Sequence, residues 1–131
     1  MRAIPFLLAL ILGTASAHTA IASMTPAAES TVNAPKEVVL KFSEPIELRF
    51  STFRVMALGT GMKPEDGAKT ALALKADASE LANLPLTARN LAAQLRIPLK
   101  PDLKAGKYVV AWKILSEDGH PVTGQNVFTV K

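Results

Sequence analysis

The most regular alternation of apolar and polar positions in the chain runs from Lys107 to Leu115. A period of two residues is typical of a β-strand, because successive side chains of a strand point to opposite faces. One face of this expected strand carries Tyr108, Val110, Trp112 and Ile114, and the other carries Val109, Ala111 and Lys113. We therefore predict a strand here, with Trp112 in the hydrophobic core.

Two more strands are expected in the first half of the chain. Lys36–Phe42 is rich in β-branched residues and ends at the turn signal Ser43-Glu44-Pro45. Leu48–Leu58 alternates less regularly, and a bulge at Ser51-Thr52 would restore its phase.

The region after these strands is ambiguous. Gly59–Gly67 has Gly, Pro and Asp in turn positions and is predicted to be a loop. Thr70–Lys75 alternates Ala and Leu, which favours a short strand followed by a loop, although the Ala and Leu content of Ala71–Leu84 also fits a helix. Met56 and Met62 are predicted to fill gaps in the core rather than to bind metal.

Strands also close the chain. The segment from Leu95 to Leu99 alternates and contains Pro98, which favours a position at a sheet edge, and Gln125–Lys131 is predicted to be the last strand. Seven or so short strands separated by Pro and Gly turns indicate an all-β domain, an antiparallel sandwich or barrel with Greek-key connections. It is immunoglobulin-like but without the disulfide, since the chain has no cysteine.

The first 17 residues have the pattern of a cleavable secretory signal peptide. Arg2 precedes an apolar run from Ile4 to Leu12, and small residues end the segment at Ala15-Ser16-Ala17. The alternative is an uncleaved anchor, but a membrane-spanning helix needs about 20 apolar residues. We expect one mature domain, residues 18–131, that is exported, soluble and periplasmic, with no membrane insertion after signal cleavage.

Composition excludes several functions. The absence of cysteine removes thiolate metal sites and thiol chemistry. The net charge of +4 is mild and the basic residues are scattered, so nucleic acid is not an expected partner. No phosphate-binding glycine motif is present, and a nucleotide cofactor is not expected.

The two histidines of the chain are the candidate metal ligands. Cleavage after Ala17 would make His18 the first residue, and its α-amine and ring Nδ1 could then chelate one ion. His120 would add an imidazole, and Asp118 a carboxylate from the same face if the segment is extended. Three nitrogens and one oxygen suit Cu(II), with zinc as a competitor. Other interpretations stay open: His120 as a surface turn residue, and Asp118 as a turn-forming residue before Gly119.

The sequence resembles the CopC family of periplasmic copper-resistance proteins. The resemblance rests on His18, Thr25-Pro26, Leu40-Lys-Phe-Ser-Glu-Pro45, Ser116-x-Asp118-Gly-His120-Pro121-Val-x-Gly124, and Phe128-x-Val130. It implies a seven- or eight-stranded Greek-key β-barrel of immunoglobulin-like shape, with Cu(II) held by His18, Asp118 and His120. In some members a carboxylate after the first strand also contributes. Glu44 occupies that position, with the shaping of a Glu-Pro turn as its alternative role.

The expected function is therefore a periplasmic Cu(II) carrier or buffer in copper homeostasis and resistance, and not an enzyme. Its expected partners are copper ion and either an inner-membrane copper importer or another periplasmic copper protein. Two alternatives are a copper oxidative enzyme built on an N-terminal histidine and an immunoglobulin-like interaction module without metal.

Overall fold

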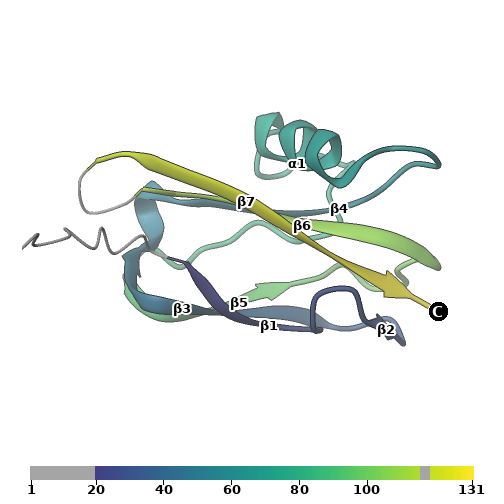
Figure 1. The fold of residues 1–131 in the computed structure, drawn as a ribbon, viewed down its shortest axis with the longest axis horizontal. Coiled ribbons are helices and arrows are strands. Elements are labelled where there is room, and N and C mark those ends of the chain that lie inside the picture. Colours follow the sequence, from purple (N-terminus) through teal and green to yellow (C-terminus); the bar gives the residue numbers. More distant parts are fainter. Residues whose placement is uncertain (1–19, 116–118) are drawn as a thin grey trace, which may run out of the picture.

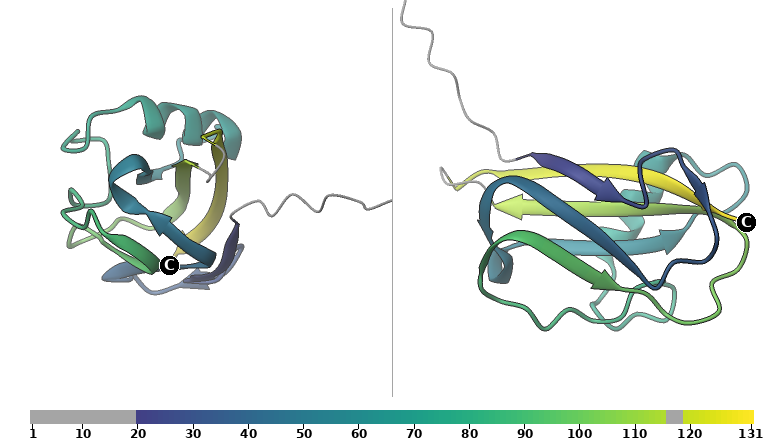
Figure 2. Two further views of the ribbon diagram at one scale, coloured as in Figure 1. Left: turned by 90° about the vertical axis from the view of Figure 1, so that its left-hand side faces the viewer. Right: turned by 90° about the horizontal axis from the view of Figure 1, so that it is seen from below.

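Two β-sheets packed face to face make up the protein. The computed structural model describes residues 20–115 and 119–131, and Figures 1 and 2 show the sheets as two layers. One sheet has the order β1-β3-β5, and the other has the order β2-β7-β6-β4. The strands are β1 (Ile21–Thr25), β2 (Thr31–Val32), β3 (Glu37–Glu47), β4 (Thr52–Ala57), β5 (Leu91–Pro98), β6 (Gly106–Leu115) and β7 (Pro121–Val130). The predicted all-β, immunoglobulin-like sandwich is confirmed.

The strand pairings are antiparallel apart from that of the short β2, which runs parallel to β7. β6 and β7 form the longest pairing, a hairpin in register from Gly106 opposite Val130 to Leu115 opposite Pro121. β5 lies at the edge of its sheet, as Pro98 predicted.

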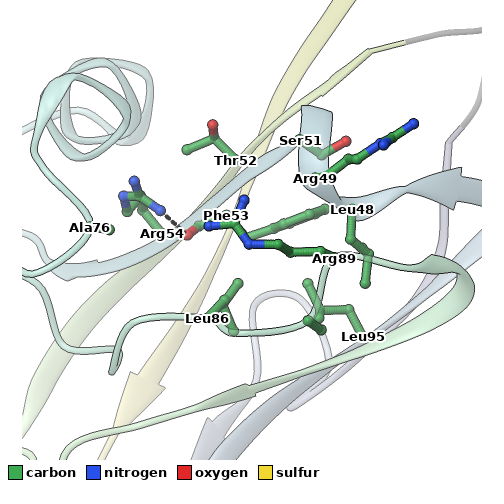
Figure 3. Close-up of a pocket in the computed structure, with 11 residues that line it drawn as sticks. Leu48, Arg49, Ser51, Thr52, Phe53, Arg54, Ala76, Leu86, Arg89 and Leu95 are labelled. Atoms are coloured by element: carbon green, nitrogen blue, oxygen red, sulfur yellow. Dashed lines mark hydrogen bonds between the residues drawn. The ribbon is translucent and has the colours of Figure 1, made fainter.

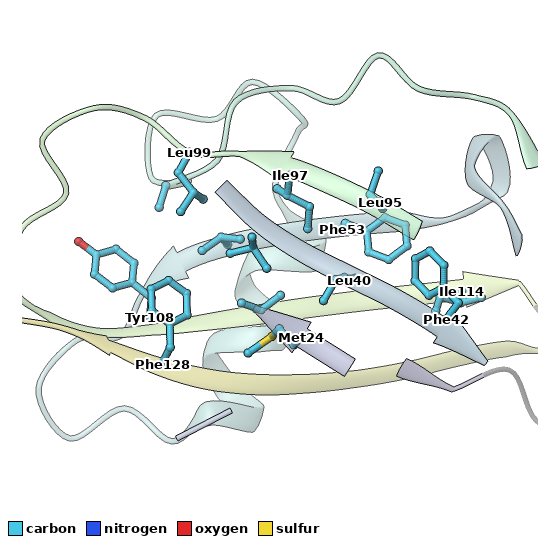
Figure 4. Packing of buried hydrophobic residues seen from close by; sticks show 14 of the residues in the cluster. Met24, Leu40, Phe42, Phe53, Leu95, Ile97, Leu99, Tyr108, Ile114 and Phe128 are labelled. Carbon is cyan, nitrogen blue, oxygen red and sulfur yellow. The ribbon is translucent and has the colours of Figure 1, made fainter. Parts of the chain in front are cut away.

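The core fills the space between the two sheets (Figure 4). Phe42 of one sheet meets Phe53 of the other, with ring centroids 5.8 Å apart. Tyr108 and Phe128 stack at 5.6 Å on neighbouring strands. Removal of these apolar surfaces from water is the main force that holds the two layers together.

The faces of β6 agree with the predicted alternation. Tyr108, Val110 and Ile114 lie in the core between the sheets, whereas Val109 and Ala111 are buried on the outer side. Trp112 is only partly buried, at the margin of the core. It lies across Gly124 of β7, where a Cβ would come within 2.7 Å of the indole ring.

The prediction of a strand at Thr70–Lys75 was wrong. Helix α1 (Pro64–Ala73) occupies this region, and it also takes the last residues of the loop predicted at Gly59–Gly67. Proline at the first helical position and acidic residues in the first turn favour a helix start. Ala68 and Ala71, three residues apart, face the sheet, so the Ala and Leu content reflects a helical stripe and not a two-residue period.

Helix α1 covers the outer face of the four-stranded sheet (Figure 1). It packs on Met56, Val109 and Ala111 to form a second, smaller apolar cluster. Met56 is therefore a core residue as predicted. Met62 is 39% exposed, so the prediction that it fills a gap in the core was wrong. Within residues 20–115 and 119–131, no helix has the length and apolar character needed to cross a membrane.

The other corrections concern strand ends. β3 continues through Ser43-Glu44-Pro45 to Glu47, and a 3-10 helix, η1 (Leu48–Phe50), replaces the first part of the strand predicted at Leu48–Leu58. This 3-10 helix interrupts the strand next to the position where a bulge was expected. The Ser51 N–H ends the 3-10 turn by donating to the carbonyl of Leu48 (3.1 Å). β1 and β2 were not predicted because neither has a clear alternation, and β7 begins at Pro121, earlier than expected.

Candidate metal centre

His120 lies where β7 begins, at the turn of the β6–β7 hairpin. It directly precedes Pro121, the residue opposite Leu115 in the last pair of the hairpin, and it is exposed. Gly119 before it has φ +82°, in the left-handed region that favours glycine. The chain is therefore not extended at Gly119, and the alternation used to place Asp118 and His120 on one face does not describe this turn.

The start of β1 is attached to the middle of β3 by a pair of hydrogen bonds. The Ala20 N–H donates to Oγ of Ser43, and the Ser43 N–H donates to the carbonyl of Ala20, both at 2.9 Å. Ala20 is only two residues beyond His18 in the sequence. These bonds fix where the chain that follows His18 joins the sandwich.

Glu44 follows Ser43 in an irregular part of β3. The register between β3 and β5 shifts between Lys41 and Ile46, and Glu44 is half-buried inside that interval. A shift of this kind changes the direction of side chains compared with a regular strand. It gives Glu44 a defined place directly beside the residue that holds the start of β1.

These three segments lie at the same end of the sandwich. Figures 1 and 2 show the start of β1, the end of β6 and the start of β7 at this end, and β3 runs toward it before entering η1. The fold thus places the segments that contain His120 and Glu44 at the same end as the start of β1.

His18 and Asp118 themselves lie outside the described residues. In the part of the chain that the structure describes, no three His, Asp or Glu side chains gather in a group that could hold a metal ion. The two predicted ligands that the structure describes, His120 and Glu44, are an imidazole and a carboxylate, which are donor types that accept a divalent ion such as Cu(II) or zinc. His18 and Asp118 stay predictions as ligands.

Ser43 is a residue of this centre that the sequence did not identify as part of the site. The Ser-Glu-Pro segment was interpreted as the end of a strand, and a serine hydroxyl that accepts an N–H from a residue 23 positions earlier leaves no local signal. Its hydroxyl and its N–H hold Ala20 at the start of β1.

Proteins of known identity are similar to this chain along most of its length. The family model described as CopC domain matches residues 21–131. Copper resistance protein C of Escherichia coli is 34% identical over 122 residues, covering 89% of this chain and 84% of that protein. Copper resistance protein C of Pseudomonas syringae pv. tomato is 36% identical over 123 residues, covering 93% of this chain and 87% of that protein.

Two solved structures are similar along nearly their whole length. PcoC, a methionine-rich copper resistance protein from Escherichia coli, has a TM-score of 0.60 and 31% identity, covering 88% of this chain and all of that one. CopC from Methylosinus trichosporium OB3b has a TM-score of 0.57 and 30% identity, covering 87% of this chain and 94% of that one.

Proposed function

This chain belongs to the CopC family, and on that basis we propose that it binds copper as a carrier or buffer in copper homeostasis and resistance. The observation that carries the proposal is the family match itself. The family match extends from Ile21 to Lys131, and His120 is exposed at the end of the sandwich where β1 and β7 begin.

We infer that the bound ion is Cu(II) and that its ligands are His18, Asp118 and His120, with Glu44 as an additional carboxylate. A free His18 supplies its α-amine and Nδ1, and His120 supplies a second imidazole. Nitrogen-rich sites with one or two oxygen ligands favour Cu(II) among the first-row divalent ions. The hydrogen bonds between Ala20 and Ser43 support Glu44 as a ligand, since they hold the N-terminal segment next to it.

This ligand set requires export and cleavage. Only removal of residues 1–17 exposes the α-amine of His18, and we place the mature protein, residues 18–131, in the periplasm. There it would receive or deliver copper through contact with an inner-membrane importer or another periplasmic copper protein.

Uptake and release follow from the chemistry of the donors. An amine and two imidazoles bind copper only in their neutral forms, so the metal displaces protons and its affinity falls as the pH is lowered. With His120 exposed on a hairpin turn, a partner's ligands can approach the ion without unfolding of the sandwich.

The position of Tyr108 argues against the alternative of a copper oxidative enzyme. Such a site would use an aromatic residue beside the metal, but Tyr108 is buried and its hydroxyl donates to the carbonyl of Lys104 (2.7 Å). It also lies seven residues before Leu115 on β6, about 20 Å from the hairpin turn at the rise of an extended strand.

The proposal is tested by Cu(II) competition titrations on protein that begins at His18. We expect His120→Ala and Asp118→Asn to weaken binding strongly and Glu44→Gln to weaken it less. Asp77→Asn, an exposed carboxylate in the segment after α1, is the matched control and should bind as the unsubstituted protein does. Full affinity in His120→Ala would contradict the proposed site, and weak binding by every form would favour the interaction module without metal.

A further inference from the structure

The hydroxyl of Ser43 takes part in the pairing of β1 with β3. In a regular antiparallel ladder, the two residues of a hydrogen-bonded pair exchange N–H to carbonyl bonds in both directions. Ala20 and Ser43 make one such bond, from the Ser43 N–H to the Ala20 carbonyl (2.9 Å). In the other direction the Ala20 N–H donates to Oγ of Ser43 (2.9 Å). A side-chain oxygen thus takes the place of a backbone carbonyl at this pair.

The ladder around this pair is irregular. The register between β1 and β3 shifts between Ile21 and Ser23, and the register between β3 and β5 shifts between Lys41 and Ile46. Ser43 lies inside the second interval, where regular strand pairing does not fix the direction of the chain. The exact place of Ala20 therefore depends on local contacts rather than on a continuous ladder.

Little apolar packing holds the chain at Ala20. Ile21 is partly buried and packs against the core between the sheets, whereas Ala20 and Ser43 are both exposed. Burial thus fixes the strand from Ile21 onward. At Ala20, the two hydrogen bonds to Ser43 are the contacts that hold the backbone to β3.

These bonds are close in sequence to two of the proposed copper ligands. Glu44 directly follows Ser43, and His18 precedes Ala20 by two residues. Two residues of extended chain span at most about 7 Å. Any copper site that contains His18 must therefore lie within a short reach of Ala20, and a shift of Ala20 changes the point from which His18 has to reach the ion.

We propose that Ser43 is a positioning residue for the N-terminal copper ligand: its hydroxyl fixes Ala20 next to the Glu44 segment, so that a free His18 reaches the ion from a defined point. This inference rests on the proposed function and deepens it. Without the hydroxyl, the Ala20 N–H either pairs with the Ser43 carbonyl or bonds to water. Both changes displace the chain before β1, and a metal site requires its ligands to be held within about 0.5 Å.

The first test is a Cu(II) competition titration on protein that begins at His18. Ser43→Ala should bind Cu(II) about 2–10-fold more weakly, which is the usual effect of losing one hydrogen bond. Ser43→Thr keeps a hydroxyl at the same position and should retain most of the affinity. Unchanged affinity in Ser43→Ala would overturn the proposal.

Ser51 provides the matched control. It lies at the same end of the sandwich, directly after η1, and its hydroxyl donates to the carbonyl of Glu47 (3.1 Å). Figure 3 shows it near Arg49, beside a cavity lined by η1, β4 and β5. Because this bond closes a local turn and does not involve β1, Ser51→Ala should bind Cu(II) as the unsubstituted protein does. Equal losses in Ser51→Ala and Ser43→Ala would contradict a specific role of Ser43.

A second comparison shows whether Ser43 acts through residue 18. In a form that combines His18→Ala with a glycine added before it, neither donor of His18 is available. Ser43→Ala should leave the residual Cu(II) affinity of this form unchanged, because no ligand remains for Ser43 to position. The same fold-loss in both forms would show that the substitution damages the rest of the site, and it would overturn the proposal.

The hydrogen bond itself is tested without copper. In the metal-free protein, the amide hydrogen of Ala20 should exchange with solvent faster in Ser43→Ala than in Ser51→Ala, because it has lost its acceptor. Equal exchange rates in the two variants would contradict the bond to Oγ.

The outcomes separate this inference from the proposed function. If the unsubstituted protein that begins at His18 has no tight Cu(II) site, the proposed function itself fails. If that protein binds Cu(II) tightly and Ser43→Ala binds it equally well, only the role of Ser43 fails.

Discussion

Tyr108 is the only tyrosine of the chain, and its surroundings are those of a core residue. Its ring stacks on Phe128 and its hydroxyl is satisfied by the carbonyl of Lys104. The sequence predicted this role from the strong alternation of β6, where each second residue faces the core. A strict period of two leaves little choice of face, which explains why this prediction was reliable.

Because the chain has one tyrosine, a titration of phenol absorbance reports the ionisation of Tyr108 alone. Removal from water raises the pKa of its phenol above the ordinary value, since the charged phenolate is disfavoured in the core. A spectroscopic pH titration should show phenolate formation at higher pH in the folded protein than in urea. The unfolded chain ionises first, so stability should fall as the pH rises through the interval between the two pKa values. Coincident titration curves would contradict burial of the hydroxyl.

At the scale of single residues, the sequence identified candidate ligands but not the residues that hold the ligand-bearing segments in place. His120 and Asp118 attract attention because of their residue types and their spacing of two. Ser43 acts through the backbone of Ala20, a residue 23 positions earlier, so it cannot be found without the fold. The left-handed Gly119 also shows why a spacing of two does not place two side chains on one face of a turn.

At the scale of elements, the error at α1 has a clear physical origin. Six residues that alternate Ala and Leu fit a strand, but the helix starts earlier, at Pro64, and buries its alanines against the outer face of β4 and β6. Small side chains permit this close packing, and at Gly67 a Cβ would meet Cδ2 of Leu58 too closely. Tertiary contact, which the local pattern does not contain, decides the structure of this segment.

The tight packing of α1 leads to a prediction with an internal control. Ala71 is fully buried between the helix and the sheet, whereas Ala73 on the same helix is exposed. Ala71→Leu should lower the free energy of unfolding by about 1–3 kcal/mol through overpacking. Ala73→Leu should have little effect, because it adds the same side chain to the solvent face. Urea unfolding measures both, and equal stability of the two variants would contradict the docking of α1.

At the scale of the whole molecule, the β-sandwich was predictable because β-alternation and turn residues recur along most of the chain, although β1 and β2 were missed and one predicted strand is part of α1. The grouping at one end was not predictable from periodicity, since the start of β1, the irregular part of β3 and the hairpin turn are far apart in sequence. The structure places the segments of His120 and Glu44 at that end. His18 and Asp118 lie outside the described residues and stay predictions as ligands.

The central claim is that a free N-terminal His18 and His120 hold Cu(II) together at this end. The most direct measurement compares Cu(II) affinity in two forms of the protein, one starting at His18 and one with a single glycine added before it. The added residue removes the α-amine from the chelate and leaves every side chain in place. We predict a one-to-one site in the first form, with a Cu(II) affinity at least about tenfold higher than in the second. Changes to residues that only support metal ligands typically cost about 10–100-fold in affinity, so loss of a ligand itself should cost at least as much. Equal affinity in both forms would contradict the account.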